Sequence, residues 1–134
     1  MSRIGARALA DAAAAEIETW TLEQALARHG DEDVVFVDVR DVREVWREGT
    51  IAGAYHAPRD MLEFWVDPDS PYAKEIFQSG KRFAFFCASG DGMRSALSAK
   101  AVQDMGLTPV CRVYGGFAGW RDAGGPVEQR KRKS

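Results

Sequence analysis

The chain has 134 residues, of which 46% are hydrophobic and 28% are charged. This size and composition predict one globular domain with a substantial hydrophobic core. The formal net charge of −2 argues against nucleic-acid binding by the body of the protein, and no run of ~18 apolar residues predicts a membrane span.

The two ends of the chain differ in composition from the middle. Residues 1–15 are rich in alanine but include Arg3, Arg7 and Asp11, which predicts a frayed or helical extension rather than a secretory signal peptide. Residues 129–134 form a basic tail; such a run is usually solvated but can also contact RNA or an acidic partner. Without a signal peptide, the expected compartment is the reducing cytoplasm. Residues 16–128 remain as the predicted domain.

The first half of the chain alternates short apolar runs with helical patterns, which predicts an α/β fold with a parallel sheet. Thr21 and Asp41 are favourable N-cap residues, and Gln24 and Glu44 follow them at the position that completes a capping box. The mostly β-branched run at 34–39 is typical of a central strand buried on both faces. The elements expected here are strands at 16–20, 34–39 and within 51–56, and helices at 22–29 and 42–48.

The second half of the chain continues this alternation. The aromatic-rich turn at 61–65, with Phe64 and Trp65, is expected either to pack in the core or to form a lid or partner-facing patch near the site. Ser70 followed by proline combines an N-cap with a favourable first helical residue, which predicts a further helix. Strands are expected at 82–87 and 110–114, and helices at 94–105 and 117–123. The inward face of the helix at 94–105 is expected to hold Leu97, Ala101, Val102 and Met105.

Cys87 ends a predicted strand, and a helix begins a few residues later. The glycines of the connecting loop let backbone N–H groups turn inward, and the helix start adds unpaired donors and a positive dipole end. The helix dipole and Arg94 are expected to favour the thiolate of Cys87, which can attack sulfur or phosphorus bearing negative oxygens. The alternative is an inert cysteine before an ordinary loop. The candidate substrate-binding residues are Ala88, Ser89, Gly90, Asp91, Gly92, Met93, Arg94 and Ser95.

The second cysteine, Cys111, is predicted near the start of the last strand. In a parallel sheet this places it at the edge opposite Cys87, ~10 Å or more away, whereas a disulfide needs Cα atoms within ~7 Å. We therefore expect no disulfide between them. The two cysteines and two histidines are scattered without the spacing of a zinc site, so no metal and no cofactor are expected.

From about residue 19 to residue 128 the chain resembles the rhodanese superfamily. The matching pieces are Asp38-Val39-Arg40 followed by Glu44, the segment Gly-Thr-Ile-Ala-Gly-Ala-Tyr-His-Ala-Pro at 49–58, Cys87 with Arg94-Ser95, and Tyr-Gly-Gly-Phe-Ala-Gly-Trp at 114–120. Their order and separations make the resemblance specific. It implies a rhodanese-like fold, with a five-stranded parallel sheet and helices on both faces. It also implies that Cys87 is a catalytic nucleophile that forms a persulfide and passes the sulfur to a thiophilic acceptor.

The loop departs from the pattern of that family. Six residues separate Cys87 from Arg94, whereas the sulfurtransferases have four and the cell-cycle phosphatases with this fold have five. The simplest alignment makes Asp91 and Gly92 the additional residues, which predicts a wider cradle. An inward-pointing Asp91 would weaken thiosulfate binding, but an outward turn position is favoured because Asp-Gly is a common turn pair.

Asp38, Arg40 and Trp65 are candidate border residues of the site. Asp38 and Arg40 stand at the carboxyl end of a predicted strand, where ligands bind in parallel α/β sheets, but an ion-pair cluster that holds the loop is favoured. His56 is a candidate general base, although none is needed if Cys87 is already a thiolate.

The predicted function is a sulfurtransferase or persulfide carrier. Cys87 would take sulfane sulfur from a small anionic donor of the thiosulfate type and pass it to a thiol or to an acceptor protein, with no membrane or nucleic-acid partner expected. One alternative is a Cys-dependent phosphatase or arsenate-type enzyme, for which Asp91 is the one candidate general acid. Another is a non-catalytic rhodanese binding module, against which the intact Cys87 and Arg94 argue.

Overall fold

A five-stranded parallel sheet crosses the centre of the molecule in the order β1-β6-β5-β2-β4. Its strands are β1 (Glu18–Trp20), β2 (Val34–Asp38), β4 (Tyr55–His56), β5 (Arg82–Phe86) and β6 (Val110–Val113). The computed structural model describes residues 3–132; residues 1, 2, 133 and 134, which belong to the predicted extension and basic tail, lie outside the described residues.

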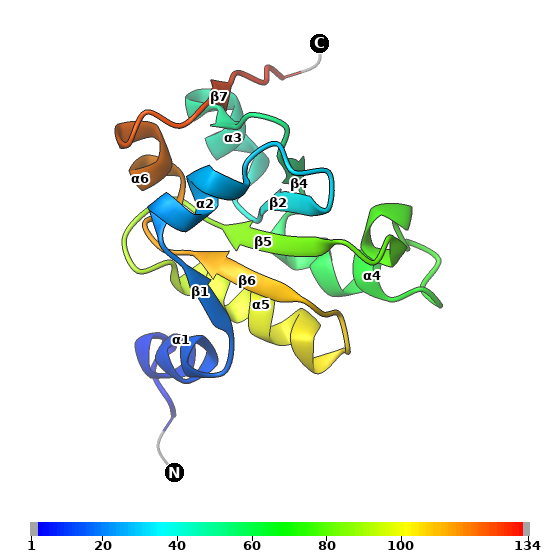
Figure 1. Ribbon diagram of the computed structural model, residues 1–134. Helices are drawn as coiled ribbons and strands as arrows, with labels where there is room; N and C mark the ends of the chain where they lie inside the picture. Colours follow the sequence, from blue (N-terminus) through cyan, green and yellow to red (C-terminus); the bar gives the residue numbers. More distant parts are fainter. Residues whose placement is uncertain (1–2, 133–134) are drawn as a thin grey trace.

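Helices cover both faces of this sheet (Figure 1). On one side lie α2 (Leu22–Arg28), α3 (Val42–Glu48) and α6 (Gly116–Asp122), and on the other α4 (Leu62–Val66) and α5 (Met93–Asp104). The predicted fold class is therefore confirmed. Both predicted capping boxes are present, because Thr21 and Asp41 each exchange hydrogen bonds with the residue three positions on. No helix in the described part of the chain is long and apolar enough to span a membrane.

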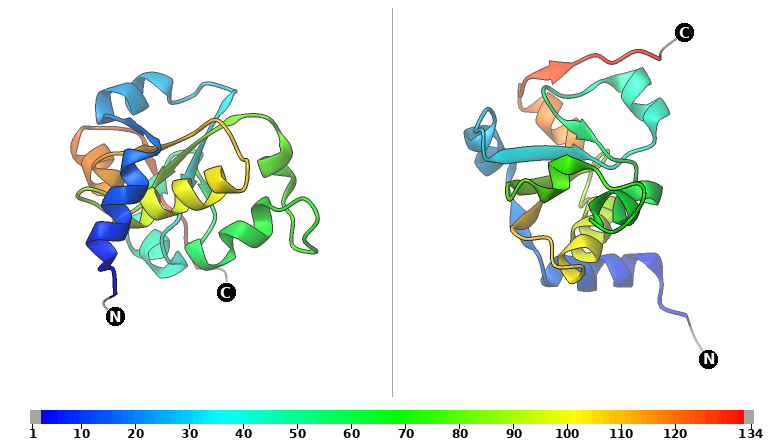
Figure 2. Two further views of the ribbon diagram at one scale, coloured as in Figure 1. Left: turned by 90° about the horizontal axis from the view of Figure 1, so that it is seen from below. Right: turned by 90° about the vertical axis from the view of Figure 1, so that its right-hand side faces the viewer.

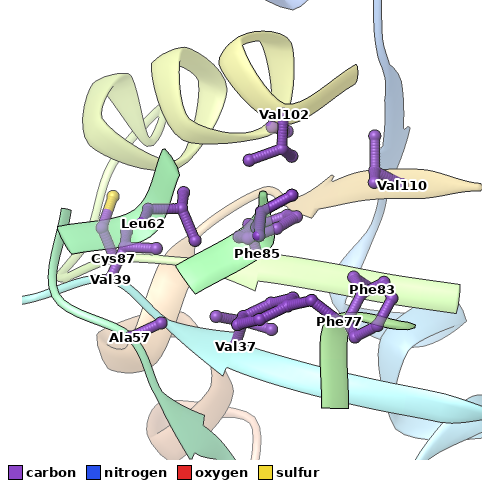
Figure 3. Close-up of a cluster of buried hydrophobic side chains, with 12 residues drawn as sticks. Val37, Val39, Ala57, Leu62, Phe77, Phe83, Phe85, Cys87, Val102 and Val110 are labelled. Atoms are coloured by element: carbon purple, nitrogen blue, oxygen red, sulfur yellow. The ribbon is translucent and has the colours of Figure 1, made fainter. Parts of the chain in front are cut away.

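Strand β5 supplies side chains to two separate core layers, since successive residues of a strand face opposite sides of the sheet. Phe83 and Phe85 pack with α4 and α5, whereas Ala84 and Phe86 pack with α2 and α6. Cys87 follows β5 and belongs to the first layer, where Figure 3 shows it at one end, beside α5. The alternation that buries the core thus also fixes the direction of the Cys87 side chain.

The N-terminal extension contains a helix, α1 (Ala6–Ala15), which packs against α5 (Figure 2). Because α5 lies between the sheet and α1, small residues cover much of its surface. Its buried residues are Ser95, Ala96, Ser98, Ala99 and Val102. The predicted inward face was therefore correct for Val102 but wrong for Met105, which is exposed; Leu97 and Ala101 are only partly buried.

Two further segments differ from the prediction. No α-helix begins at Ser70; its hydroxyl accepts the N–H of Tyr72 in a local turn, and a short 3-10 helix, η2 (Glu75–Gln78), follows instead. The strand expected within 51–56 is β4, and the 3-10 turn η1 (Arg59–Met61) connects it to α4. A second, antiparallel pair joins β3 (Thr50–Ile51) to β7 (Val127–Glu128) and was not predicted. It fastens the C-terminal segment beside α3.

Candidate active site

The Cys87 thiol lies where the carboxyl edge of the sheet meets the amino end of α5. Its sulfur is 3.6 Å from the Ser95 hydroxyl oxygen, and that hydroxyl donates to the Gly92 carbonyl at 3.0 Å. Cys87 is only 3% exposed. The thiol opens onto a hollow of about 160 Å³, which is lined by Cys87, Ala88, Ser89, Asp91, Met93 and Arg94. Most of the predicted substrate-binding residues therefore line the hollow, whereas Gly90, Gly92 and Ser95 do not.

The loop directs most of its carbonyl groups away from the thiol. Three of them accept backbone N–H groups from the start of α6, at 2.8 to 3.1 Å. The carbonyls of Cys87, Ala88 and Gly90 accept the N–H groups of Phe117, Ala118 and Gly115, respectively. The Asp91 carbonyl accepts the Arg112 guanidinium. By contrast, no backbone N–H of residues 88–95 donates to an acceptor within the part of the chain that the structure describes. Unpaired backbone donors at a helix start are the groups that the anion-binding cradle expected from the sequence requires.

Glycines allow this close arrangement. Gly92 has φ +69°, and a Cβ there would lie 2.7 Å from the Ser95 hydroxyl oxygen and 3.8 Å from the Cys87 sulfur. Gly116 has φ +61°, and a Cβ there would lie 2.7 Å from the Cys87 carbonyl oxygen. The glycine pair at 115–116 in the closing sequence motif therefore lets the backbone of α6 reach the loop and hold its carbonyls.

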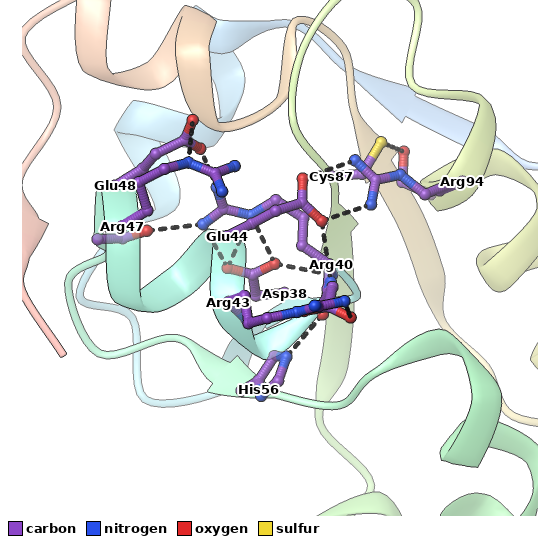
Figure 4. A network of polar contacts seen from close by, with 12 residues as sticks. Asp38, Arg40, Arg43, Glu44, Arg47, Glu48, His56, Cys87 and Arg94 are labelled. Carbon is purple, nitrogen blue, oxygen red and sulfur yellow. Dashed lines mark hydrogen bonds and ion pairs between the residues drawn. The ribbon is translucent and has the colours of Figure 1, made fainter. Parts of the chain in front are cut away.

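Arg94 extends toward α3 and forms a two-pronged ion pair with Glu44. The two nitrogen–oxygen distances are 2.8 and 3.1 Å (Figure 4). This pairing raises the pKa of the Arg94 guanidinium and lowers the pKa of the Glu44 carboxyl below its ordinary 4.5. Glu44 also accepts the N–H of Asp41 at 3.0 Å, so the same carboxylate caps α3 and restrains the arginine of the loop.

Asp38 and Arg40 form a fully buried ion pair at 2.8 Å. Arg40 also bonds the Gly49 carbonyl at 2.7 Å, and the Thr50 hydroxyl donates to Asp38 at 2.7 Å. Each buried charge is thus satisfied by several partners, as a stable interior ion pair requires. The pair supports the connection between β2 and β3 and does not line the hollow at Cys87.

Trp65 and His56 are not brought to the thiol. The Trp65 ring packs edge-on against Tyr55 at 6.3 Å and lies under the Lys74 ammonium group, so it contributes to the core layer beside α4. The His56 Nε2 atom is 2.7 Å from the Arg40 carbonyl oxygen. Neither residue lines the hollow around Cys87.

Two arginines contact the loop and were missed from the sequence. Arg7 of α1 pairs with the Asp91 carboxylate, and Arg112 of β6 donates to the Asp91 backbone carbonyl and to the Thr19 hydroxyl. Arg112 could have been found, since it stands near the carboxyl end of the strand beside β5. Arg7 could not, because its contact depends on how α1 packs. Asp91 thus has its charge engaged by α1, although it still borders the hollow.

The second cysteine is remote from this chemistry. Cys111 is fully buried in β6 and is paired in register with Ala84, three residues before Cys87. Burial raises the pKa of the Cys111 thiol to about 12. Both cysteines are free, as their positions in the sheet predicted.

Comparison with known proteins places this chain in a family. A solved structure of a protein of unknown function from Rhodopseudomonas palustris, described as a possible tyrosine phosphatase, is 55% identical, with a TM-score of 0.90 over 96% of this chain and 97% of that chain. Thiosulfate sulfurtransferase from Pseudomonas aeruginosa is 22% identical, with a TM-score of 0.76; the match covers 95% of this chain but 23% of that chain.

The polysulfide-sulfur transferase from Wolinella succinogenes is 24% identical, with a TM-score of 0.68 over 92% of this chain and 87% of that chain. At identities below 25%, the similarity to these two transferases shows only that this chain shares their fold. Among curated proteins, none matches the sequence. The model of the rhodanese-like domain matches residues 21–123, which is most of the chain. The chain therefore belongs to the rhodanese-like domain family.

Proposed function

We propose that the protein is a sulfurtransferase or persulfide carrier whose nucleophile is Cys87. The observation that carries this proposal is the loop around the thiol, in which the backbone N–H groups of residues 88–95 have no acceptor among the described residues while most carbonyls are bonded elsewhere. Such a turn stabilises negative charge next to the sulfur. A thiosulfate-type donor is negatively charged at this position, and so is the persulfide that forms on the cysteine.

The reaction divides into two sulfur transfers. The Cys87 thiolate attacks the outer sulfur of thiosulfate; a new S–S bond forms as the bond to the sulfonate sulfur breaks, and sulfite leaves with the electron pair. An acceptor thiolate then attacks the outer sulfur of the Cys87 persulfide, takes that sulfur and releases the Cys87 thiolate. The loop N–H groups stabilise the anion at each stage, and Ser95 is within reach of the sulfur.

A Cys-dependent phosphatase is the second candidate, because the 55% identical protein is described as a possible tyrosine phosphatase and the loop is longer than in sulfurtransferases. Two contacts oppose it. Phosphate binding would use the fork of Arg94, which Glu44 occupies, and Asp91 would have to protonate a leaving alkoxide, but its carboxylate pairs with Arg7. The small hollow also suits a sulfane sulfur better than a phosphotyrosine ring.

Parallel assays of one protein preparation test the proposal. Thiocyanate formation from thiosulfate and cyanide reports sulfur transfer, and hydrolysis of p-nitrophenyl phosphate reports phosphatase activity. We expect sulfur transfer that the Cys87→Ser variant lacks, with no phosphate release. Phosphate release that depends on Cys87, without sulfur transfer, would establish the phosphatase instead. If the folded wild type has neither activity, the proposal is wrong and the protein is a non-catalytic binding module.

A further inference from the structure

Three adjoining hollows lead from Cys87 across the amino end of α3 to the C-terminal segment. Arg94 lines both the hollow at Cys87 and a second one of about 500 Å³. Val42 lines both the second hollow and a third of about 580 Å³, whose far wall is the segment Arg130 to Arg132. The three hollows therefore adjoin one another in a row, with the buried thiol at one end and basic residues at the other; we call this row the trough.

The basic end of the trough is held in place by several contacts. Arg130 bonds Glu128 at 3.0 Å and the Ala54 carbonyl at 2.5 Å, which fixes the segment that follows β7. The Arg132 guanidinium lies 5.7 Å from the centre of the Trp46 ring. Both Lys131 and Arg132 are exposed, and within residues 3–132 neither has a carboxylate partner. The trough thus ends in two unneutralised cations beside an aromatic wall.

The middle of the trough has the opposite electrostatic character. Asp60 lines the second hollow, is exposed and pairs with no cation in the described part of the chain. The cations in that hollow are already engaged, since Arg94 pairs with Glu44 and Arg59 pairs with Glu63 at 2.6 Å. An acidic ligand is therefore attracted at the tail end and repelled in the middle, which gives the trough a direction.

We infer that the trough is the docking site for a protein that exchanges sulfur with Cys87. Its occupant is an extended segment with carboxylates near Lys131 and Arg132, an apolar side chain against Trp46 and a cysteine at the opposite end. This inference rests on the proposed function of Cys87. A protein segment suits the trough better than a small thiol does, because a small thiol would contact only the hollow of about 160 Å³. The unpaired Asp60 favours an acidic protein segment over RNA, because a peptide can confine its carboxylates to one end whereas the phosphates of RNA repeat along the whole strand.

Direct binding tests this site without sulfur chemistry. The probe is a short synthetic peptide that contains Asp and Glu, one leucine and a serine in place of cysteine; the comparison peptide carries Asn and Gln instead. We expect calorimetry to detect the acidic peptide, with the Lys131→Glu/Arg132→Glu variant binding it about tenfold more weakly. The Lys74→Glu/Lys81→Glu variant has the same change in charge, and Lys81 precedes β5 at the sheet edge opposite Cys87. It should bind like the wild type.

Sulfur transfer to the cysteine-containing forms of both peptides completes the test. We expect the Lys131→Glu/Arg132→Glu variant to raise KM for the acidic peptide about tenfold and to leave kcat and transfer to dithiothreitol unchanged. If Cys87 takes no sulfur, the proposed function fails whatever the peptides do. If Cys87 takes sulfur but acidic and neutral peptides bind and react alike, the docking inference alone is wrong. Tighter binding of a short RNA than of the acidic peptide would also overturn it.

Discussion

Both carboxylate oxygens of Glu44 contact the guanidinium of Arg94, so the arginine beside the nucleophile is neutralised by a helix cap from another part of the fold. Arg94 remains 42% exposed at its side chain, and the pair spans the gap between the loop and α3. Release of Arg94 would add positive charge at the mouth of the hollow. This relationship makes Glu44 a determinant of how strongly the site attracts an anionic donor.

We predict that Glu44→Gln lowers KM for thiosulfate by about three- to fivefold, because an uncompensated surface charge is worth up to about 1 kcal/mol. Glutamine retains the capping interaction with the Asp41 N–H, so the fold should persist. Glu18→Gln is the matched control, since Glu18 pairs with Arg82 at 2.7 Å away from the loop. A higher KM in Glu44→Gln would mean that Arg94 binds the donor only when Glu44 orients it.

The same ion pair predicts a pH dependence of stability. The folded-state pKa of Glu44 lies below its ordinary 4.5, with the Arg94 hydrogen bond as the largest cause. Its contribution is therefore present above about pH 4.5 and is lost as the pH falls through the lowered value. At pH 6, thermal melts should give wild type a free energy of unfolding about 0.5–1 kcal/mol higher than that of Glu44→Gln. Near pH 3 the two free energies should be equal. A difference that grows toward low pH would contradict this assignment.

A comparison of alanine substitutions at Gly92 and Gly90 distinguishes the effect of backbone strain from the effect of crowding at the thiol. Both have positive φ, but a Cβ at Gly90 meets nothing within 4 Å, whereas one at Gly92 would strike the Ser95 hydroxyl. Each alanine substitution should cost about 1–2 kcal/mol of stability. We predict that only Gly92→Ala lowers sulfur transfer more than about tenfold, because it displaces groups around the sulfur. Equal losses of kcat/KM in the two folded variants would show that the contact at Gly92 is unimportant.

The contact between Arg7 and Asp91 connects two features that set this chain apart. Helix α1 lies outside the residues 21–123 that match the family model, and Asp91 belongs to the lengthened loop. Since α1 engages the Asp91 carboxylate, we predict that Asp91→Asn leaves KM for thiosulfate unchanged. Arg7→Gln should raise KM about two- to fivefold, because the freed carboxylate then repels the donor at the hollow.

The double variant Arg7→Gln/Asp91→Asn provides the control for this pair. Its KM for thiosulfate should return to the wild-type value, because the repelling charge is gone. A fall in KM in Asp91→Asn alone would show that the Asp91 charge already repels the donor despite its pairing with Arg7. If Arg7→Gln raises KM for thiosulfate equally in the wild type and in the Asp91→Asn background, Arg7 does not act through Asp91.

Local patterns predicted the parts of the fold that depend on neighbouring residues. The capping boxes at Thr21 and Asp41 and the alternation in β5 need only short stretches of sequence, and the position of Cys87 follows from them. The ion-pair cluster of Asp38 and Arg40 also agrees with its favoured interpretation. These features have signals that a single sequence contains.

Features that depend on tertiary packing were not predictable in the same way. The buried face of α5 was assigned only in part, because α1 covers a side of the helix that a single amphipathic pattern would leave to solvent. The pairing of β3 with β7 joins short segments far apart in the chain, with no turn signal between them. For the same reason, the sequence did not reveal that Arg7 reaches the loop.

Peptide mapping by mass spectrometry after thiosulfate treatment tests the role of Cys87 most directly. Wild type and Cys111→Ser, unfolded and digested without reductant, should each gain one sulfur atom on the peptide that contains Cys87. Cyanide should remove that atom, and Cys87→Ser should gain none. Cys111 should stay unmodified, because it is buried and its thiol pKa is raised to about 12. Folded wild-type protein that gains no sulfur on Cys87, or that gains it equally on Cys111, would contradict the persulfide mechanism.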